Sequence, residues 1–374
     1  MASTPRPYLR IPESANTVSV SVIDTTSSIK GVDAWKFVSP SFPGHEYLAT
    51  PCFSFLIEHR AQHRSLLFDL GVRKDWWNYS PFLINRFRNG GYTINVEKSV
   101  REILQENCFD AAKLEAVVWS HWHFDHIGNV NEFDKSTALI VGPGFKKNLL
   151  PAYPTNPDSA LLESDFEGRN LVELQMSSDL WIGEMEAVDY FGDGSLYFLN
   201  SPGHAHGHIC ALARVTADPP SFILMGGDSY HHAGELRPSP YMPLPLIIEP
   251  NPFSPMTLSS CPGALFEPIL RDGDRARPIY EPSAQTKVQT HLDPKKAINT
   301  IQKLQQADVH DNILMVAAHD ESLLDILDFY PKKANDFMQK GWVKQARWRF
   351  LRDFAKAVGY EGDVDGKSNW APVA

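Results

Sequence analysis

The stretch SHWHFDHIGN, residues 120–129, concentrates metal-binding side chains directly after an apolar run at residues 116–119. Four potential ligands occupy six positions: His121, His123, Asp125 and His126. Residues two apart at the end of a strand point the same way, so His121 and His123 can address one metal ion. Asp125 and His126, on the turn that follows, can reach a second ion. A lone histidine is usually a packing or surface residue, but a cluster of this density predicts a metal site.

Three further metal-type ligands follow other apolar, strand-like runs. Residues 196–199 lead through Ser-Pro-Gly to His204, residues 222–225 lead through Gly-Gly to Asp228, and residues 313–318 end at His319. The glycines leave no side chain to obstruct the ligands. Five histidines and two carboxylates suit zinc or a similar divalent ion, and seven ligands are too many for one tetrahedral ion. The pattern therefore predicts two metal ions that share one bridging carboxylate.

The elements that must position these ligands are mainly strands. Val18, Val20 and Val22 alternate with polar residues, which is typical of a half-buried strand. Further strand-like runs lie at residues 53–57, 66–68, 116–119, 137–141, 196–199, 209–215, 222–225 and 313–318. Helices are predicted behind Asn95 as N-cap and behind Asp293, with a proline at the first helical position. Strands outnumber helices, and helices fall between groups of strands, which predicts an α/β protein with helix-covered sheets.

One part of the chain departs from this pattern. Eleven of the 28 prolines lie between Pro238 and Pro282, a density that excludes long helices and central strands. We interpret residues 1–374 as a single domain with a proline-rich insertion at residues 235–290 and a C-terminal helical extension at residues 329–374. The insertion follows a ligand closely, and two readings stay open: a lid or pocket wall, or a passive excursion.

Composition narrows the class of protein. The formal net charge of -10 argues against nucleic acid as the main partner, because phosphate binding needs clustered cations. No apolar run has membrane-spanning length, and the N-terminus has no apolar signal-peptide core, so we expect no membrane partner. The four cysteines lie far apart, which fits reduced thiols in the cytosol better than disulfides. These observations favour a cytoplasmic globular enzyme, and they leave a homodimer open.

The segments HWHFDH, SPGHAHGH, GGDS and AAHD resemble the ordered metal motifs of the metallo-β-lactamase superfamily, over residues 18–325. The resemblance implies a four-layer αββα sandwich with a binuclear site, two Zn²⁺ ions by preference, at one edge of the two sheets. It implies a first ion held by His121, His123 and His204, and a second held by Asp125, His126 and His319, with Asp228 bridging. Asp69, in LLFDLG, matches an aspartate that braces the site by orienting a ligand histidine.

Such a site predicts hydrolysis of an acyl bond. Two neighbouring metal ions lower the pKa of a shared water to about neutrality and give a bridging hydroxide nucleophile. Asp125 could pass a proton to the leaving group, and Tyr230 could donate a hydrogen bond to the oxyanion. In the related lactonases, the tyrosine used in this way falls one position later, where this chain has His231.

The substrate class is inferred from the ligand set and from aromatic residues. Asp228 in place of a cysteine separates this chain from the antibiotic-degrading zinc enzymes, and SPGHxxGH is similar to lactonases and glyoxalase II. Candidates for an apolar, ring-accepting pocket are Trp76, Trp77, Tyr79, Trp122, Phe124 and His231. We predict a lactone- or lactam-opening hydrolase for a small, cyclic, uncharged ester or amide. The chain also resembles fungal lactamases that open benzoxazolinone-type rings, which would suit detoxification.

Two other activities stay open. A glyoxalase-II-like or carrier-protein thioesterase would favour a cationic patch, which the C-terminal segment with Lys344, Arg347, Arg349, Arg352 and Lys356 could supply. An iron-dependent persulfide dioxygenase uses one iron and fewer ligands than the seven present here. Iron, manganese and cobalt also accept nitrogen and oxygen ligands. The remaining histidines are expected to have structural or surface roles: His45, His59, His63, His291 and His310. His206 and His208 are expected either to support the metal ligands from behind or to pack in a strand near His204.

Overall fold

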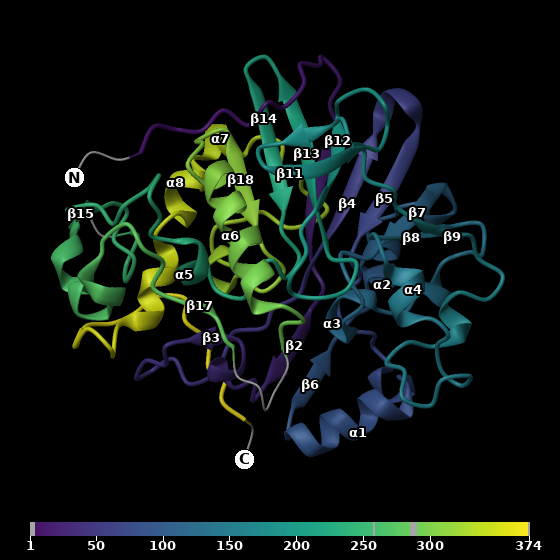
Figure 1. Cartoon of the computed structure of the whole chain (residues 1–374), viewed down its shortest axis with the longest axis horizontal. Coiled ribbons are helices and arrows are strands. Elements are labelled where there is room, and N and C mark those ends of the chain that lie inside the picture. Colours follow the sequence, from purple (N-terminus) through teal and green to yellow (C-terminus); the bar gives the residue numbers. More distant parts are fainter. Residues whose placement is uncertain (1–3, 257–258, 285–289, 373–374) are drawn as a thin grey trace.

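The computed structural model describes residues 4–256, 259–284 and 290–372, and it contains two six-stranded sheets that pack face to face (Figure 1). The first sheet has the order β1 (Ser19–Asp24), β4 (Phe53–His59), β5 (Arg64–Phe68), β7 (Leu114–Val118), β8 (Ala138–Val141) and β9 (Leu171–Glu173). The second has the order β10 (Trp181–Ile182), β11 (Met185–Asp189), β12 (Leu196–Asn200), β13 (Ile209–Ala217), β14 (Pro220–Met225) and β18 (Ile313–Val316).

Strand direction brings the ligand-bearing ends together. β5, β7, β8 and β9 run parallel, and β18 runs parallel to β14. Phe68 pairs with Val118, so the loops that follow β5 and β7 leave the sheet at the same level. The carboxyl ends of parallel strands meet at one edge of a sheet, which is where ligands usually bind.

Alternation along the strands divides the side chains between the core and the outer layers. Phe55 and Phe68 point into the core between the sheets, whereas Leu56 and Leu67 point outward from the first sheet. Burial of each such side chain contributes roughly 1.5–3 kcal/mol to the free energy of folding. The continuous apolar runs predicted most of these strands correctly, because strands covered on both faces are apolar along nearly their whole length.

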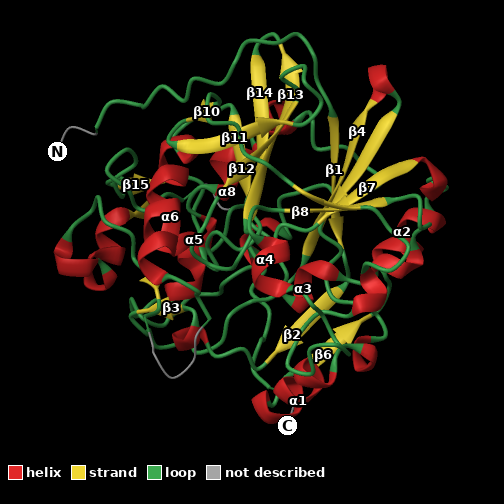
Figure 2. Cartoon of the chain, turned by 45° about the vertical axis from the view of Figure 1, so that its right-hand side comes forward, coloured by secondary structure: helices red, strands yellow, loops and turns green. Residues whose placement is uncertain are grey.

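Helices cover the outer faces, as Figures 1 and 2 show. The α-helices of the described residues are α1 (Pro81–Gly90), α2 (Val100–Glu106), α3 (Phe124–Ile127), α4 (Phe145–Leu149), α5 (Ala233–Leu236), α6 (Pro294–Asp308), α7 (Phe337–Lys340) and α8 (Trp342–Ala346). Of these, α7 and α8 pack through Phe337 and Trp342 on the core between the sheets. Leu83, Leu104 and Phe145 cover the first sheet, whereas Ile301 and Leu304 cover the second. The four-layer αββα sandwich is confirmed.

Helix starts follow from capping residues. Asp293 caps α6 with Pro294 at the first position, as predicted. The predicted N-cap at Asn95 is wrong: residues Thr93–Val96 form β6, and α2 begins at Val100 after a capping box of Ser99 and Glu102. The box satisfies two backbone N–H groups reciprocally, so the helix begins there and not earlier.

The remaining elements are short. The other strands are β2 (Ser27–Lys30), β3 (Val38–Ser39), β6 (Thr93–Val96), β15 (Ile247–Ile248), β16 (Cys261–Pro262) and β17 (Glu281–Pro282). The 3₁₀ turns are Ala34–Lys36, Arg60–Gln62, Trp76–Asn78, Ala111–Lys113, Val130–Glu132, Glu163–Asp165, Gly263–Ile269, Arg271–Gly273, Glu321–Leu323 and Arg349–Phe354. In the described ranges, no helix is both long and apolar enough to cross a membrane.

The described part of the proline-rich segment packs against the C-terminal segment. The rings of Phe253 and Tyr360 stack at 3.9 Å between centroids, and Arg349 donates a hydrogen bond to the carbonyl of Pro252 at 2.6 Å. β17 pairs with β3, next to Phe37. Residues 257–258 and 285–289 of the predicted insertion lie outside the described residues. The division into domain, insertion and extension stays a prediction.

The C-terminal segment forms short helical turns and no long basic helix. Arg349 and Arg352 are buried, and both pair with Asp325, at 2.5 and 3.3 Å. Arg347 pairs with Asp311 at 2.9 Å. These three cations therefore do not form the solvated basic patch that a thioesterase reading would use.

Candidate metal centre

The metal-type ligands lie in loops that leave β7, β12, β14 and β18 at one edge of the sandwich. Their side chains form two adjoining groups within the described residues: His121, His123, His204 and Asp228 in one, and Asp125, His126 and His319 in the other. All seven residues predicted as metal ligands are therefore brought together, although strands from both sheets separate them in sequence.

In the first group, three imidazole nitrogens face one another. Nδ1 of His123 lies 2.9 Å from Nε2 of His121 and 2.8 Å from Nε2 of His204, and the two Nε2 atoms are 3.2 Å apart. Burial lowers the pKa of His123 to about 4 and the pKa values of His121 and His204 well below their usual range. Three neutral imidazoles whose ring nitrogens converge in this way form the donor arrangement that a divalent cation requires.

The second group converges on one oxygen of Asp228. Its Oδ1 lies 3.0 Å from Nε2 of His126 and 3.2 Å from Nε2 of His319, and Oδ2 of Asp125 lies 3.4 Å from the same nitrogen of His319. Burial opposes the charged forms, yet Asp228 raises the pKa values of both histidines well above their usual range. The negative charge of the carboxylates thus favours positive charge at this place, and a bound cation would supply it.

Asp228 spans the two groups. Its Oδ2 faces the first, at 3.5 Å from Nε2 of His204 and 3.8 Å from Nε2 of His121, while its Oδ1 faces the second. Oδ1 of Asp228 and Nε2 of His126 are buried and make no hydrogen bond. Orphaned polar atoms that face each other are costly unless a ligand satisfies them. The donor set fits two divalent ions with Asp228 between them.

Two neighbouring groups select the tautomers of the histidines. Asp69 accepts from Nδ1 of His126 at 2.8 Å and from the backbone N–H of Ser120 at 2.6 Å. Nδ1 of His319 donates to the carbonyl of Pro51 at 2.7 Å. Each hydrogen bond keeps the proton on Nδ1 and leaves Nε2 free toward the centre. Asp69 therefore lies where it can orient the ligand histidine His126, as the resemblance implied.

Two further histidines support the ligands: His291, for which a structural or surface role was expected, and His208, for which support of the ligands was one of two readings. Nε2 of His291 donates to the carbonyl of Phe37 at 3.0 Å, which leaves Nδ1 of His291 facing Nδ1 of His204 at 3.4 Å. Nε2 of His208 accepts from the backbone N–H of Asp228 at 3.0 Å. The spacing within SPGHAHGH could have singled out His208. No local pattern marks His291, because it meets His204 only in the folded chain.

A narrow cavity opens on Asp125, Asp228 and His319. Its walls are apolar and aromatic: Ile29, Val32, Phe37, Leu48, Ala49, Thr50, Tyr92 and Phe124, with Arg86 and His231. Of the residues predicted for the pocket, Phe124 and His231 line this cavity. Both ring nitrogens of His231 are buried without a hydrogen bond, and Nε2 lies 3.3 Å from Oδ2 of Asp228.

Four predicted pocket aromatics do not line this cavity: Trp76, Trp77, Tyr79 and Trp122. The side chain of Trp77 is 62 % exposed, and Trp76 packs on Phe87 of α1. The hydroxyl of Tyr79 donates to the carbonyl of Phe124 at 2.5 Å and so supports the turn behind the cavity wall. The loop after Asp69 turns its rings onto α1 and away from the metal-type ligands.

Tyr230 is also misplaced for the predicted hydrogen bond to substrate. Its ring packs with Leu212, Leu224 and Leu304 in the apolar layer under α6. His231 lines the cavity, whereas Tyr230, one residue earlier, belongs to the core.

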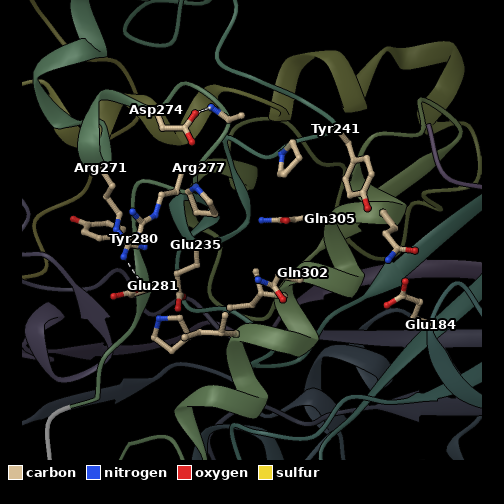
Figure 3. Close-up of a pocket in the computed structure, with 17 residues that line it drawn as sticks. Glu184, Glu235, Tyr241, Arg271, Asp274, Arg277, Tyr280, Glu281, Gln302 and Gln305 are labelled. Carbon is tan, nitrogen blue, oxygen red and sulfur yellow. Dashed lines mark hydrogen bonds and ion pairs between the residues drawn. The ribbon is translucent and has the colours of Figure 1, made fainter. Parts of the chain in front are cut away.

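A wider cavity, about 640 Å³, is lined by residues of α5, α6 and the proline-rich segment (Figure 3). Gln302, Gln305, Tyr241 and an Arg271–Glu281 ion pair of 2.5 Å lie around it, and none of the seven metal-type ligands is among its lining residues. Glu235 connects the two places, because its carboxylate accepts from the backbone N–H of His231 at 2.6 Å. Glu235 thus holds the backbone of His231, and only the narrow cavity opens on the metal-type ligands.

Comparison with known proteins agrees with this geometry. A family model of the metallo-beta-lactamase superfamily matches residues 48–214. Gamma-lactamase FDB1 of Fusarium pseudograminearum is 48 % identical over 369 residues, which cover 96 % of this chain and 89 % of FDB1. Gamma-lactamase MBL2 of Gibberella moniliformis is 51 % identical over 241 residues, 64 % of this chain and 100 % of MBL2. The chain belongs to the metallo-β-lactamase superfamily, and it is a hydrolase of that superfamily.

Solved structures share the fold. A mutant of B. thuringiensis AiiA, crystallised with N-decanoyl-L-homoserine at its active site, matches with a TM-score of 0.56 and 16 % identity. The match covers 85 % of this chain and 99 % of that one.

Proposed function

We propose that this hydrolase uses two divalent metal ions to open a small cyclic ester or amide. The observation that carries the proposal is the division of Asp228: one carboxylate oxygen faces His121 and His204, and the other faces His126 and His319. A carboxylate placed in this way suits two ions a few ångströms apart.

The donor set of five histidines and two carboxylates favours zinc. When bound, two such ions supply a water of lowered pKa and a Lewis acid for the substrate carbonyl. Asp69, His291 and His208 would hold the ligands and Asp228 in place. Asp125 borders the cavity and lies 3.4 Å from His319, where it can receive a proton from the attacking water and pass it to the leaving atom.

We assign to His231 the role first considered for Tyr230. It lines the cavity, its two ring nitrogens make no hydrogen bond within the described residues, and Nε2 lies 3.3 Å from Oδ2 of Asp228, beside the metal-type ligands. The ring packs on Phe37 at 4.8 Å between centroids, which holds it in place. An imidazole N–H donated to the substrate oxygen can stabilise the negative charge that develops there.

The walls of the cavity support a flat ring as the substrate. Phe37, Tyr92 and Phe124 offer aromatic faces and edges, and the polar groups gather at the metal-facing end. The names of FDB1 and MBL2, both gamma-lactamases, support a cyclic amide as one member of the substrate class. We therefore place aryl-fused lactones and benzoxazolinone-type lactams first.

The test is a matched panel offered to the zinc-loaded protein: an aliphatic lactone, an aryl-fused lactone, a benzoxazolinone-type lactam and a glutathione thioester, with products separated by chromatography. We expect opening of the rings, with the aryl-fused members preferred. Turnover of the thioester alone would contradict the proposal and favour a glyoxalase-II-like activity.

The thioesterase has less support, because Arg349 and Arg352 are buried against Asp325 and do not offer a cationic patch. Persulfide dioxygenase activity is disfavoured by the full set of seven ligands, and metal analysis of the purified protein would separate iron from zinc. A small-molecule substrate, a cytoplasmic location and a homodimer stay predictions.

A further inference from the structure

α1 presents a cation at the wall of the narrow cavity. Arg86, an exposed residue of α1, is one of the residues that line the cavity, together with Tyr92 and Phe124. α1 lies beside β2 and β6 in both views (Figures 1 and 2). Its position is fixed by Ser80, which caps the helix, and by Phe87, whose buried ring lies 4.6 Å from that of Phe124. The base of the Arg86 side chain is therefore held firmly against the cavity.

The guanidinium of Arg86 has no protein partner in the part of the chain that the structure describes: no ion pair and no hydrogen bond engages it. Neighbouring cations are engaged, since Lys36 pairs with Asp33 and Arg73 with Asp75, each at 2.8 Å. Burial is the main cause of the low pKa of His123, and the charge of Arg86 adds to it. The guanidinium thus lies within electrostatic reach of the metal-type ligands.

A ring held between Phe37, Tyr92 and Phe124 would exclude water from one side of this guanidinium. Removing water from a cation costs free energy unless the ligand supplies an acceptor. The planar guanidinium matches a carboxylate with two parallel hydrogen bonds, so a carboxylate on the far end of the ring would compensate fully. In a chain with a net charge of -10, a local cation is also needed to attract an anionic substrate.

We infer that the substrate is an aryl-fused lactone or lactam that carries a carboxylate remote from the scissile bond, and that Arg86 selects for it. The inference rests on the proposed ring-opening function and refines the uncharged substrate expected from the sequence. Arg86 holds the far end of the ring, while Asp125, His231 and the metal centre act on the carbonyl end. It is a specificity-determining residue and takes no part in bond breaking.

The experiment compares each ring substrate with its derivative that carries a distal carboxylate, in the zinc-loaded full-length protein. Arg86→Met removes the charge and keeps an unbranched side chain. Arg88→Met is the matched control, because Arg88 is exposed on the same helix and does not line the cavity. Arg86→Glu is assayed with an aminomethyl derivative as a charge reversal.

The wild-type protein should prefer the carboxylated members by about tenfold in kcat/KM, mainly through KM. A charge-assisted hydrogen bond typically strengthens binding by a factor of about ten or more. Arg86→Met should abolish the preference, whereas Arg88→Met should keep both the preference and the turnover of the uncharged substrates. Arg86→Glu should prefer the aminomethyl derivative. Equal kcat/KM for charged and uncharged members in the wild-type protein would overturn the inference.

A second readout does not depend on turnover. Calorimetric titration with benzene-1,4-dicarboxylate and with benzoate measures what the second carboxylate adds to binding. Tighter binding of the dicarboxylate to the wild-type protein and not to Arg86→Met supports the inference, and equal affinities contradict it. Absence of ring opening across both substrate series would instead contradict the proposed function.

Discussion

Asp69 offers the sharpest test of how the metal centre is held. The substitution Asp69→Asn keeps the size of the side chain, and asparagine tolerates the left-handed backbone of this residue, where φ is 62°. The amide oxygen can still accept from the backbone N–H of Ser120, but the amide nitrogen would replace the oxygen that accepts from His126 at 2.8 Å. A donor would then face a donor, unless His126 moves its proton to Nε2.

That tautomer would point a proton at Asp228 and at the second metal position. Loss of a carboxylate that orients a ligand histidine typically costs 10–100-fold in metal affinity, or about 1.4–2.7 kcal/mol. We expect this loss for one of two zinc ions, because His121, His123 and His204 do not depend on His126.

The assay is competitive titration of bound zinc with a chelator of known affinity. The matched control is Asp193→Asn, since Asp193 accepts from buried His59 at 2.6 Å outside the metal groups. The control should lose stability and keep both zinc affinities. Two zinc ions bound by Asp69→Asn with wild-type affinity would refute the reasoning.

Three further predictions concern single residues. His231→Phe should keep the packing on Phe37 but lower kcat by about 10²-fold, while Tyr230→Phe should change it less than twofold; comparable losses in steady-state kinetics would contradict the assignment. Burial lowers the pKa of His45 to about 3, so the unfolded state binds an extra proton below pH 6.5. The contribution of this residue to the free energy of unfolding should therefore fall by about 1.4 kcal/mol per pH unit as the pH drops from 6.5 toward 3. Urea unfolding at several pH values should show that His45→Gln reduces the pH dependence of this free energy by that amount. An unchanged pH dependence would exclude the contribution. At Gly203, with φ of 131°, an added Cβ would lie 2.1 Å from the backbone N of Ala297, so Gly203→Ala should cost roughly 3 kcal/mol in chemical denaturation, and a neutral result would mean that the loop before His204 adapts freely.

The strands and the metal-type ligands could be predicted from the sequence because short local patterns mark them. Continuous apolar runs identified most of the strands because both faces of the sheets are covered, and the ligand motifs identified the centre because the ligands follow the ends of strands. Asp69 could be found in the same way, since it directly follows β5.

The cavity was predicted poorly because its walls come from distant segments. Phe37 and Tyr92 carry no local sign of their position, and His291 meets His204 across 87 residues. The aromatic run at residues 76–79 is close to Asp69 in sequence, but its 3₁₀ turn directs the rings onto α1. Tyr230 and His231 are adjacent in sequence, yet Tyr230 lies in the core and His231 lines the cavity. An error of one residue in the sequence-based prediction therefore selects the wrong side chain.

The central claim is that two metal ions, bridged by Asp228, open a ring. The most direct measurement is the rate of ring opening of an aryl-fused lactone as zinc is added to the metal-free protein in known equivalents. The account predicts that the rate rises until two equivalents of zinc per chain are bound and then stays constant. A plateau at one equivalent, or no ring opening at any zinc level, would contradict it.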